Sequence, residues 1–110
     1  MTKRRVVVTG LGIVSPVGND LTSSWNNIIN GVSGIDLITH FDTTNFATKF
    51  AGEVKNFSTD GFFDAKEARR TDRFIQMGVV AGVQAVRDAG LEDLANLDKE
   101  RVGLIIGSGI

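Results

Sequence analysis

Two uninterrupted apolar runs lie near the two ends of the 110-residue chain. The first is the three valines at residues 6–8, and the second is VGLII at residues 102–106. Short β-branched runs without polar positions are typical of strands that are covered on both faces of a parallel sheet. Each run leads into glycines, at Gly10 and Gly12 and again at residues 107–109. The pattern predicts two buried parallel strands, each followed by a glycine turn, and hence an α/β fold.

A helical pattern follows the first turn. Apolar side chains recur with helical spacing over residues 21–29, which predicts an amphipathic helix with one face toward a core. Asn19 or Asp20 can cap its start, and Gly31 can cap its end. The apolar face consists of Leu21, Trp25, Ile28 and Ile29.

Residues 35–38 and 50–55 predict two short strands. Apolar and charged positions alternate in the second strand, which is typical of a half-solvated strand and favours a peripheral hairpin. His40, the only histidine of the chain, lies in the loop between them. Because no serine or cysteine motif surrounds it, a surface or turn-stabilising role is favoured over a catalytic one.

Residues 73–89 predict a helix that is unusually apolar and that Gly90 can close. There is no charge from residue 74 to residue 86, and only Gln76 and Gln84 are strongly polar. We therefore expect this helix to be buried nearly all round. A stripe of small residues would let another backbone approach it closely: Gly78, Ala81, Gly82, Ala85 and Ala89.

These elements need more cover than they can give one another. Two strands of the buried type and an apolar helix expose a large area that one amphipathic helix and a thin hairpin do not cover. We expect residues 1–110 to be the amino-terminal portion of a larger domain, or to meet the missing layers in another copy. A self-contained small α/β domain is the alternative. The aromatic residues expected in the core are Trp25, Phe50, Phe57, Phe62, Phe63 and Phe74.

Composition excludes several function classes. Apolar residues make up 42 % of the chain and the formal net charge is −1, so no overall field attracts nucleic acid or membranes. The absence of cysteine excludes disulfides, thiolate metal sites and a cysteine nucleophile within these residues. One histidine cannot form a zinc cluster. Without a signal peptide or an apolar run of transmembrane length, a cytoplasmic protein is expected.

The turn at residues 10–18 is the first candidate for ligand binding. Gly10, Gly12 and Ser15 resemble the G-x-G-x-x-G phosphate loop of dinucleotide-binding proteins, with serine in the third place. Pro16, however, delays the following helix. The fingerprint also needs an acidic residue at the end of the next strand, and the only candidate, Asp36, lies inside that strand. Close backbone packing at the glycines is favoured, and a nucleotide-binding α/β module is the alternative.

A basic cluster is the second candidate. Asp64 and Glu67 have capping-box spacing, which predicts a helix over residues 65–70. Four of the 12 basic residues lie within residues 66–73, at spacings that share one face if the helix continues. A solvated face would accommodate them, but their density favours a site for an acidic protein partner. Nucleic acid is disfavoured because no aromatic residues interleave with the charges. The four are Lys66, Arg69, Arg70 and Arg73.

Four stretches together resemble one known family. They are RRVVVTGLGIVSPVGN, HFDTTNFATKFAGEVKNF, DRFIQMGVVAGVQAVRDAGL and RVGLIIGSGI. In order and spacing they are similar to the amino-terminal part of the β-ketoacyl-acyl carrier protein synthases. The resemblance is greatest to the type II condensing enzyme of bacterial fatty acid synthesis, and it covers essentially all of residues 1–110.

The resemblance implies a thiolase-like αβαβα fold of two related halves, with residues 1–110 as the first part of the amino-terminal half. It implies a decarboxylating Claisen condensation, in which a cysteine receives an acyl chain from acyl carrier protein. Malonyl-acyl carrier protein then loses carbon dioxide, and its carbanion attacks the thioester. No cofactor is implied. The family's catalytic cysteine, two histidines and lysine match no residue here, so residues 1–110 alone are expected to be inactive.

The resemblance also assigns two sites. Lys66, Arg69 and Arg70 match the family's docking patch for acyl carrier protein, in agreement with the charge pattern. Ile110, at the end of the IGSGI motif, matches the branched residue at the mouth of the acyl pocket. The expected partners are acyl carrier protein and a second copy in a homodimer, with acyl and malonyl thioesters as substrates. Neither nucleic acid nor a membrane is expected as a partner.

Overall fold

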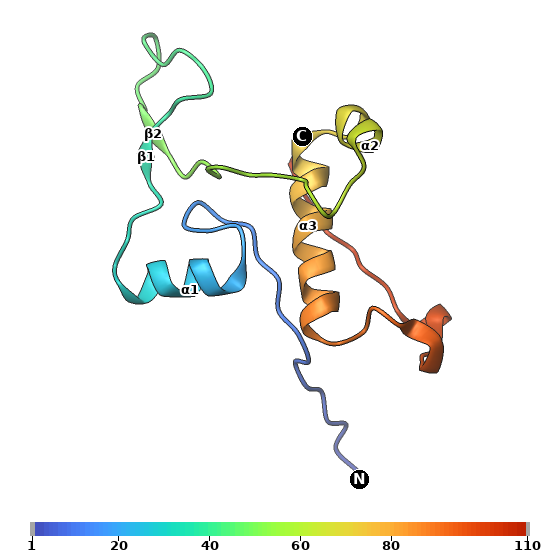
Figure 1. The fold of residues 1–110 in the computed structure, drawn as a ribbon. Coiled ribbons are helices and arrows are strands. Elements are labelled where there is room, and N and C mark those ends of the chain that lie inside the picture. Colours follow the sequence, from blue (N-terminus) through green and yellow to red (C-terminus); the bar gives the residue numbers. More distant parts are fainter. Residues whose placement is uncertain (1, 110) are drawn as a thin grey trace.

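Helix α3 (Arg73–Asp88) is the central element, and the other segments lie around it (Figure 1). The structure is a computed structural model that describes residues 2–109. Within that range two shorter helices, one hairpin and two 3₁₀ turns complete the secondary structure. They are α1 (Leu21–Ile29), β1 (Asp36–Leu37), β2 (Phe50–Ala51), α2 (Ala65–Arg70), η1 (Leu94–Asn96) and η2 (Lys99–Arg101).

The helices begin and end close to the bounds that the capping residues predict. Asp20 precedes α1, and its carboxylate accepts a hydrogen bond of 2.8 Å from the Ser23 N–H. Gly31 and Gly90, just beyond α1 and α3, each have a φ of 68°. Glycine adopts this left-handed conformation without strain and ends a helix there. The predictions for all three helices are confirmed because caps are local signals.

The predicted hairpin is also confirmed, with shorter strands than expected. β1 and β2 pair antiparallel, and the hairpin projects away from α3 (Figure 1). Pairing ends early because the N–H groups of Thr39 and His40 donate to the Glu53 carboxylate rather than to a backbone carbonyl. The paired Cα atoms are those of Asp36 with Ala51 and of Leu37 with Phe50.

The glycines after the first apolar run touch the backbone of α3. A Cβ added to Gly12 would stand 2.6 Å from the Ala85 nitrogen, and one added to Gly10 would stand 2.5 Å from the Ala89 nitrogen. Real Cβ atoms do not approach other atoms so closely, so only glycine fits at these two positions. The small-residue stripe therefore receives another backbone segment, as the sequence predicts.

The second apolar run lies along an adjacent strip of the same helix. A Cβ on Gly82 would stand 2.6 Å from the Leu104 side chain, and one on Gly78 would stand 3.4 Å from the Ile106 side chain. Along both runs, rising residue numbers meet falling residue numbers on α3. Both runs are therefore antiparallel to α3 and parallel to each other, which is the chain direction of a βαβ unit.

The prediction that these two runs form strands is wrong for the described residues, since residues 6–8 and 102–106 belong to no sheet. A strand needs a partner backbone within hydrogen-bonding distance, and neither run has one among residues 2–109. A cleft of about 310 Å³ lies where the first run ends. Residues just after the first run, residues of α3 and residues of the second run line it, among them Thr9, Gly10, Gly82, Ala85, Val102, Gly103 and Leu104.

The prediction of burial is wrong for the same runs. Val6 is 93 % exposed and Ile105 is 98 % exposed. Trp25 and Phe50, which were expected in the core, are each 60 % exposed, whereas the other four predicted core aromatics are half-buried. Among the described residues Val80 is the one buried hydrophobic side chain. The apolar faces are exposed because residues 2–109 fold no second layer over them.

Helix α3 is accordingly buried on part of its surface rather than nearly all round. Val80 and Gly82 are its buried residues, while Ile75 and Val86 are exposed. The radius of gyration is 17.3 Å, well above the roughly 13 Å expected for a compact chain of this length. The described chain is therefore open rather than compact, and the expectation of further layers stays a prediction.

Candidate functional site

The glycine turn at residues 10–18 packs against two helices. Ser15 and Gly18 exchange backbone hydrogen bonds of 2.8 and 3.2 Å, which close the turn. A Cβ on Gly18 would lie 2.7 Å from the Ser24 nitrogen, and Ser24 is buried. Gly18 therefore packs on the first turn of α1, whereas Gly10 and Gly12 face α3.

The start of α1 is already occupied by a carboxylate of the chain itself. Asp20 accepts hydrogen bonds from the Ser23 N–H at 2.8 Å and from the Ser23 hydroxyl at 2.7 Å. The Ser23 N–H, more than the hydroxyl, holds the pKa of the Asp20 carboxyl below its usual value. A phosphate loop needs free N–H groups at a helix start and glycines that face the ligand. The nucleotide-binding alternative finds no support in this geometry.

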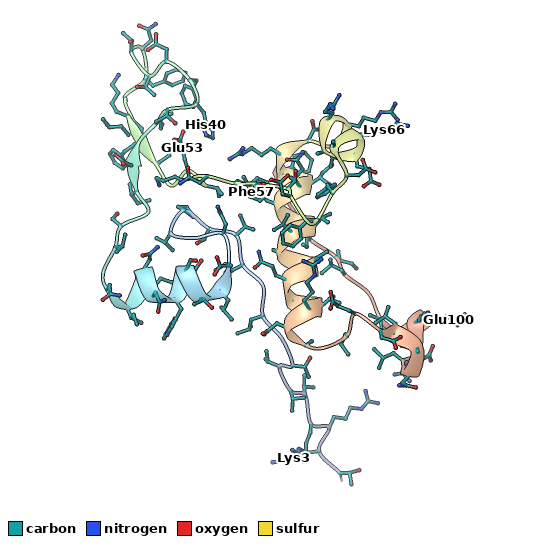
Figure 2. All side chains as sticks on the ribbon, viewed as in Figure 1. Lys3, His40, Glu53, Phe57, Lys66 and Glu100 are labelled. Atoms are coloured by element: carbon teal, nitrogen blue, oxygen red, sulfur yellow. The ribbon has the colours of Figure 1, made fainter. Side chains whose placement is uncertain are left out.

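The three basic side chains of α2 form an exposed group. Lys66, Arg69 and Arg70 are all exposed, and Lys66 extends outward from the helix (Figure 2). Within residues 2–109, none of the three side chains makes an ion pair or a hydrogen bond. We call these three residues the α2 basic face. Its charges are free to meet an anionic partner.

The acidic residues beside the α2 basic face are turned toward the helix backbone. Asp64 accepts hydrogen bonds of 2.8 Å from the N–H groups of Lys66 and Glu67. Glu67 in turn accepts one from the Asp64 N–H at 3.4 Å, which completes the predicted capping box. Because both carboxylates serve the helix start, the positive charges are not paired off by their nearest acidic neighbours.

The fourth basic residue of the predicted cluster does not join this face. α2 ends at Thr71, whose φ of −112° and ψ of 127° are extended, so the helix does not continue into α3. Arg73 instead donates a 3.2 Å hydrogen bond to the Val54 carbonyl, and its guanidinium lies 5.4 Å from the Phe57 ring centroid. The prediction of one four-residue face is wrong at Arg73 because it assumed a continuous helix.

Two further side chains from α3 hold α2 and the segments next to it. Arg87 donates a 3.2 Å hydrogen bond to the Gly61 carbonyl and lies 5.0 Å from the Phe62 ring centroid. Gln76 donates hydrogen bonds of 2.7 and 2.9 Å to the carbonyls of Ala68 and Thr71. The α2 basic face is thus mounted on α3 through the backbone on both sides of it.

The two glutamines of α3 are the residues whose role the sequence pattern did not identify. Gln76 holds α2, and Gln84 accepts from the Ile13 N–H at 3.2 Å and donates to the Asn19 carbonyl at 2.7 Å. The available signal was their isolation as the only strongly polar residues of an apolar stretch. A half-buried amide in such a position needs a hydrogen-bonding partner. Here each partner is a backbone group outside α3, near in sequence for Gln76 and distant for Gln84.

His40 has the surface role that the sequence favours. Its Nδ1 lies 3.8 Å from a Glu53 carboxylate oxygen on the hairpin (Figure 2). Desolvation raises the pKa of the Glu53 carboxyl, but hydrogen bonds from Thr39 and the His40 N–H outweigh it and lower the pKa below its ordinary value. The pair fixes the hairpin and brings no nucleophile to the histidine.

An apolar groove of about 470 Å³ runs between α3 and the second apolar run. It is lined by Phe74, Ile75, Gly78, Val79, Leu104, Ile106, Gly107 and Ser108. Ile110, the predicted pocket residue, lies outside the described residues.

Residues 2–109 bring together no three histidine, cysteine, aspartate or glutamate side chains that could hold a metal ion. None of their helices has the length and apolar character needed to cross a bilayer.

Comparison with known proteins identifies relatives along the whole chain. The 3-oxoacyl-[acyl-carrier-protein] synthase 2 of Vibrio cholerae is 54 % identical over 110 residues, which are 100 % of this chain and 26 % of the relative. The protein of that name from Vibrio harveyi gives the same identity and coverage. That of Staphylococcus aureus strain N315 is 50 % identical over 107 residues, 97 % of this chain and 26 % of the relative.

The chain therefore spans about a quarter of the length of these relatives. A family model described as the N-terminal domain of β-ketoacyl synthase matches residues 3–110. The four stretches noted in the sequence, the glycine packing along α3 and the basic face of α2 all lie within the matched range. The chain belongs to the β-ketoacyl synthase family.

Proposed function

We propose that these residues are the amino-terminal part of a type II β-ketoacyl-acyl carrier protein synthase, an acyltransferase of fatty acid synthesis. The observation that carries the proposal is the identity of 50–54 % with proteins named 3-oxoacyl-[acyl-carrier-protein] synthase 2. The family membership implies a thiolase-like fold. The parallel runs along α3 agree with an αβαβα arrangement, of which residues 1–110 would form the first part of the amino-terminal half.

The proposed reaction is a decarboxylating Claisen condensation. An acyl chain passes from its carrier thioester to an enzyme cysteine, releasing the carrier thiol. Malonyl-acyl carrier protein loses carbon dioxide, and the resulting carbanion attacks the acyl-enzyme thioester, which expels the cysteine thiolate. Residues 1–110 contain no cysteine, so their part is to build the fold and to receive the carrier protein. No cofactor takes part, and the cytoplasm is the proposed compartment.

The direct experiment is a condensation assay of the full-length protein with acyl- and malonyl-acyl carrier protein. Formation of 3-oxoacyl-acyl carrier protein with release of one carbon dioxide per product is the expected result. Residues 1–110 alone should give no turnover because they lack the nucleophile. If the full-length protein forms no condensation product, the proposed activity is wrong. Turnover by residues 1–110 would overturn the proposed division of roles.

The α2 basic face is the proposed docking site for acyl carrier protein. Its support is geometric: Lys66, Arg69 and Arg70 are exposed and unpaired within the described chain, and they share one side of a capped helix. Opposite charges that meet across an interface steer encounter and fix orientation. Affinity for the carrier should therefore fall as ionic strength rises.

Neutralisation to glutamine tests the docking site more cleanly than charge reversal. Arg69 and Arg70 lie in the last turn of α2, where glutamate would oppose the helix dipole and destabilise the helix itself. Glutamine keeps a similar helix propensity. At about 0.5 kcal/mol per exposed charge, K66Q/R69Q/R70Q should raise the Kd for acyl carrier protein roughly tenfold.

The chain offers a matched control of identical composition. Lys3, Arg4 and Arg5 are exposed, and Lys3 lies far from Lys66 (Figure 2). K3Q/R4Q/R5Q removes the same net charge without touching α2. Equal loss of carrier affinity in both triple variants would mean that only net charge matters, and it would refute a localised docking site.

We also propose a homodimer and an acyl-pocket role for Ile110. Exposed apolar side chains along both runs and α1 support the need for further protein cover. Sedimentation of the full-length protein tests the dimer, and a monomer at micromolar concentration would contradict it. For Ile110, replacement by phenylalanine should disfavour long acyl substrates relative to short ones, and an unchanged chain-length profile would argue against the role.

A further inference from the structure

Gln76 joins two carbonyl groups at the end of α2 to the first turns of α3. Its Nε2 donates hydrogen bonds of 2.7 Å to the Ala68 carbonyl and 2.9 Å to the Thr71 carbonyl. Both contacts are partly buried. The amide lies at the carboxyl end of the short helix that carries the α2 basic face, and it has no charge of its own.

α2 cannot hold its orientation unaided. It has six residues, and isolated helices of such length are unstable in water. Its other side-chain caps come from within the same segment: Asp64 caps the start, and the Thr71 hydroxyl donates to the Glu67 carbonyl at 2.7 Å. In the described chain, the bond from Gln76 to Ala68 is the only hydrogen bond that ties α2 to residues beyond 71.

We propose that Gln76 is a positioning residue for the docking of an acidic protein partner on α2. This inference rests on the proposed docking function of Lys66, Arg69 and Arg70. Three charges engage one partner together only if their helix is held in one orientation, and pre-organisation of this kind lowers the entropy lost on binding. Gln76 supplies it from the carboxyl end of α2, through the carbonyls of Ala68 and Thr71.

The test substitutes Gln76 in the full-length synthase by methionine, which keeps the length and removes both donors. The KM for acyl carrier protein substrates should rise about fivefold. kcat should be unchanged, and so should the KM for an acyl-coenzyme A substrate, which presents no protein surface. A merely structural loss would alter both substrates together, and that result would overturn the proposal.

Gln84→Met is the matched control, since it removes an amide from the same helix that bonds residues far from α2. It should lower thermal stability without a selective change in the KM for the carrier substrate. If Gln76→Met does not fold, Gln76→Asn, which keeps the amide on a shorter side chain, should give a smaller selective increase. An equal selective increase from the Gln84 variant would overturn the proposal.

Combination with K66Q/R69Q/R70Q separates this inference from the docking proposal. If Gln76 acts through the α2 basic face, Gln76→Met should change the carrier KM little once the three charges are gone. If the carrier KM still rises fivefold in that background, the positioning role of Gln76 is wrong, while the docking proposal stands. If the triple variant itself binds the carrier normally, the docking proposal fails, and the role of Gln76 fails with it.

Discussion

Replacement of Gly12 by alanine should disrupt the contact between the opening turn and α3. A Cβ at this position would lie 2.6 Å from the Ala85 nitrogen and 2.8 Å from the Gln84 Cβ, and closer still to the Ala81 carbonyl oxygen. Two of these three neighbours are helix backbone, which cannot rotate away. The turn or the helix must therefore move by more than about 1 Å to restore ordinary van der Waals distance to the Ala81 carbonyl.

This movement lowers the free energy of unfolding. Overpacking of a close contact typically costs about 1–3 kcal/mol, and a backbone contact belongs at the upper end. The shift would also strain the 3.2 Å hydrogen bond from the Ile13 N–H to Gln84. We therefore expect Gly12→Ala to lower the free energy of unfolding by about 3 kcal/mol.

Guanidinium unfolding of the full-length protein, followed by circular dichroism, measures this loss. Gly103→Ala is the control, because nothing lies within 4 Å of the Cβ it would add. The loss of unfolding free energy for Gly82→Ala should lie between those of the other two variants. Its added Cβ would meet only the flexible end of the Leu104 side chain, and alanine improves helix propensity by about 1 kcal/mol. A Gly12→Ala protein within 0.5 kcal/mol of the parent, roughly the scatter for surface changes, would refute the packing role. Saturable nucleotide binding that Gly12→Val abolished in a folded protein would favour the alternative.

Two further predictions concern the small elements. Asp64→Ala should destabilise α2 by about 1 kcal/mol through loss of its cap, and amide exchange in α2 should become faster. Replacement of the exposed Asp60 by alanine should leave this exchange unchanged. Equal effects of the two substitutions would contradict the capping role. Hydrogen bonds from Thr39 and His40 hold the pKa of Glu53 below its ordinary 4.5 despite desolvation. Their stabilisation is complete above that value and is lost as the pH falls through the lowered folded-state pKa. Amide shifts of the hairpin should follow this titration, and Glu53→Gln should abolish it; a titration that survives the substitution would identify another group.

The sequence predicted those elements whose signals are local. The capping box at Asp64 and the glycine beyond α3 mark helix ends that neighbouring residues enforce, so three helices could be placed within one or two residues. The runs at residues 6–8 and 102–106 carry a strand composition. A strand nevertheless exists only when a partner backbone lies within hydrogen-bonding distance, and neither run has one in the described chain. The sequence pattern predicted their parallel direction and that some backbone packs closely on the small-residue stripe, but not their lack of pairing.

The same distinction explains what was and was not foreseen in the candidate site. The spacing of Lys66, Arg69 and Arg70 on one helix is a local property, and the structure retains it. Arg73 does not share the α2 basic face, because the helix ends at Thr71. Its contact with Phe57 joins two segments that are separate in the sequence. The role of Gln76 depended on the fold in the same way.

Helix α3 links these observations, because its polar and small residues hold three different segments. Gln76 holds α2, Gln84 holds the opening turn, and Gly82 receives the second apolar run. A single helix thus holds the α2 basic face and two parallel chain segments in one arrangement. Under the docking proposal, a partner bound on α2 would therefore keep a constant distance to both segments.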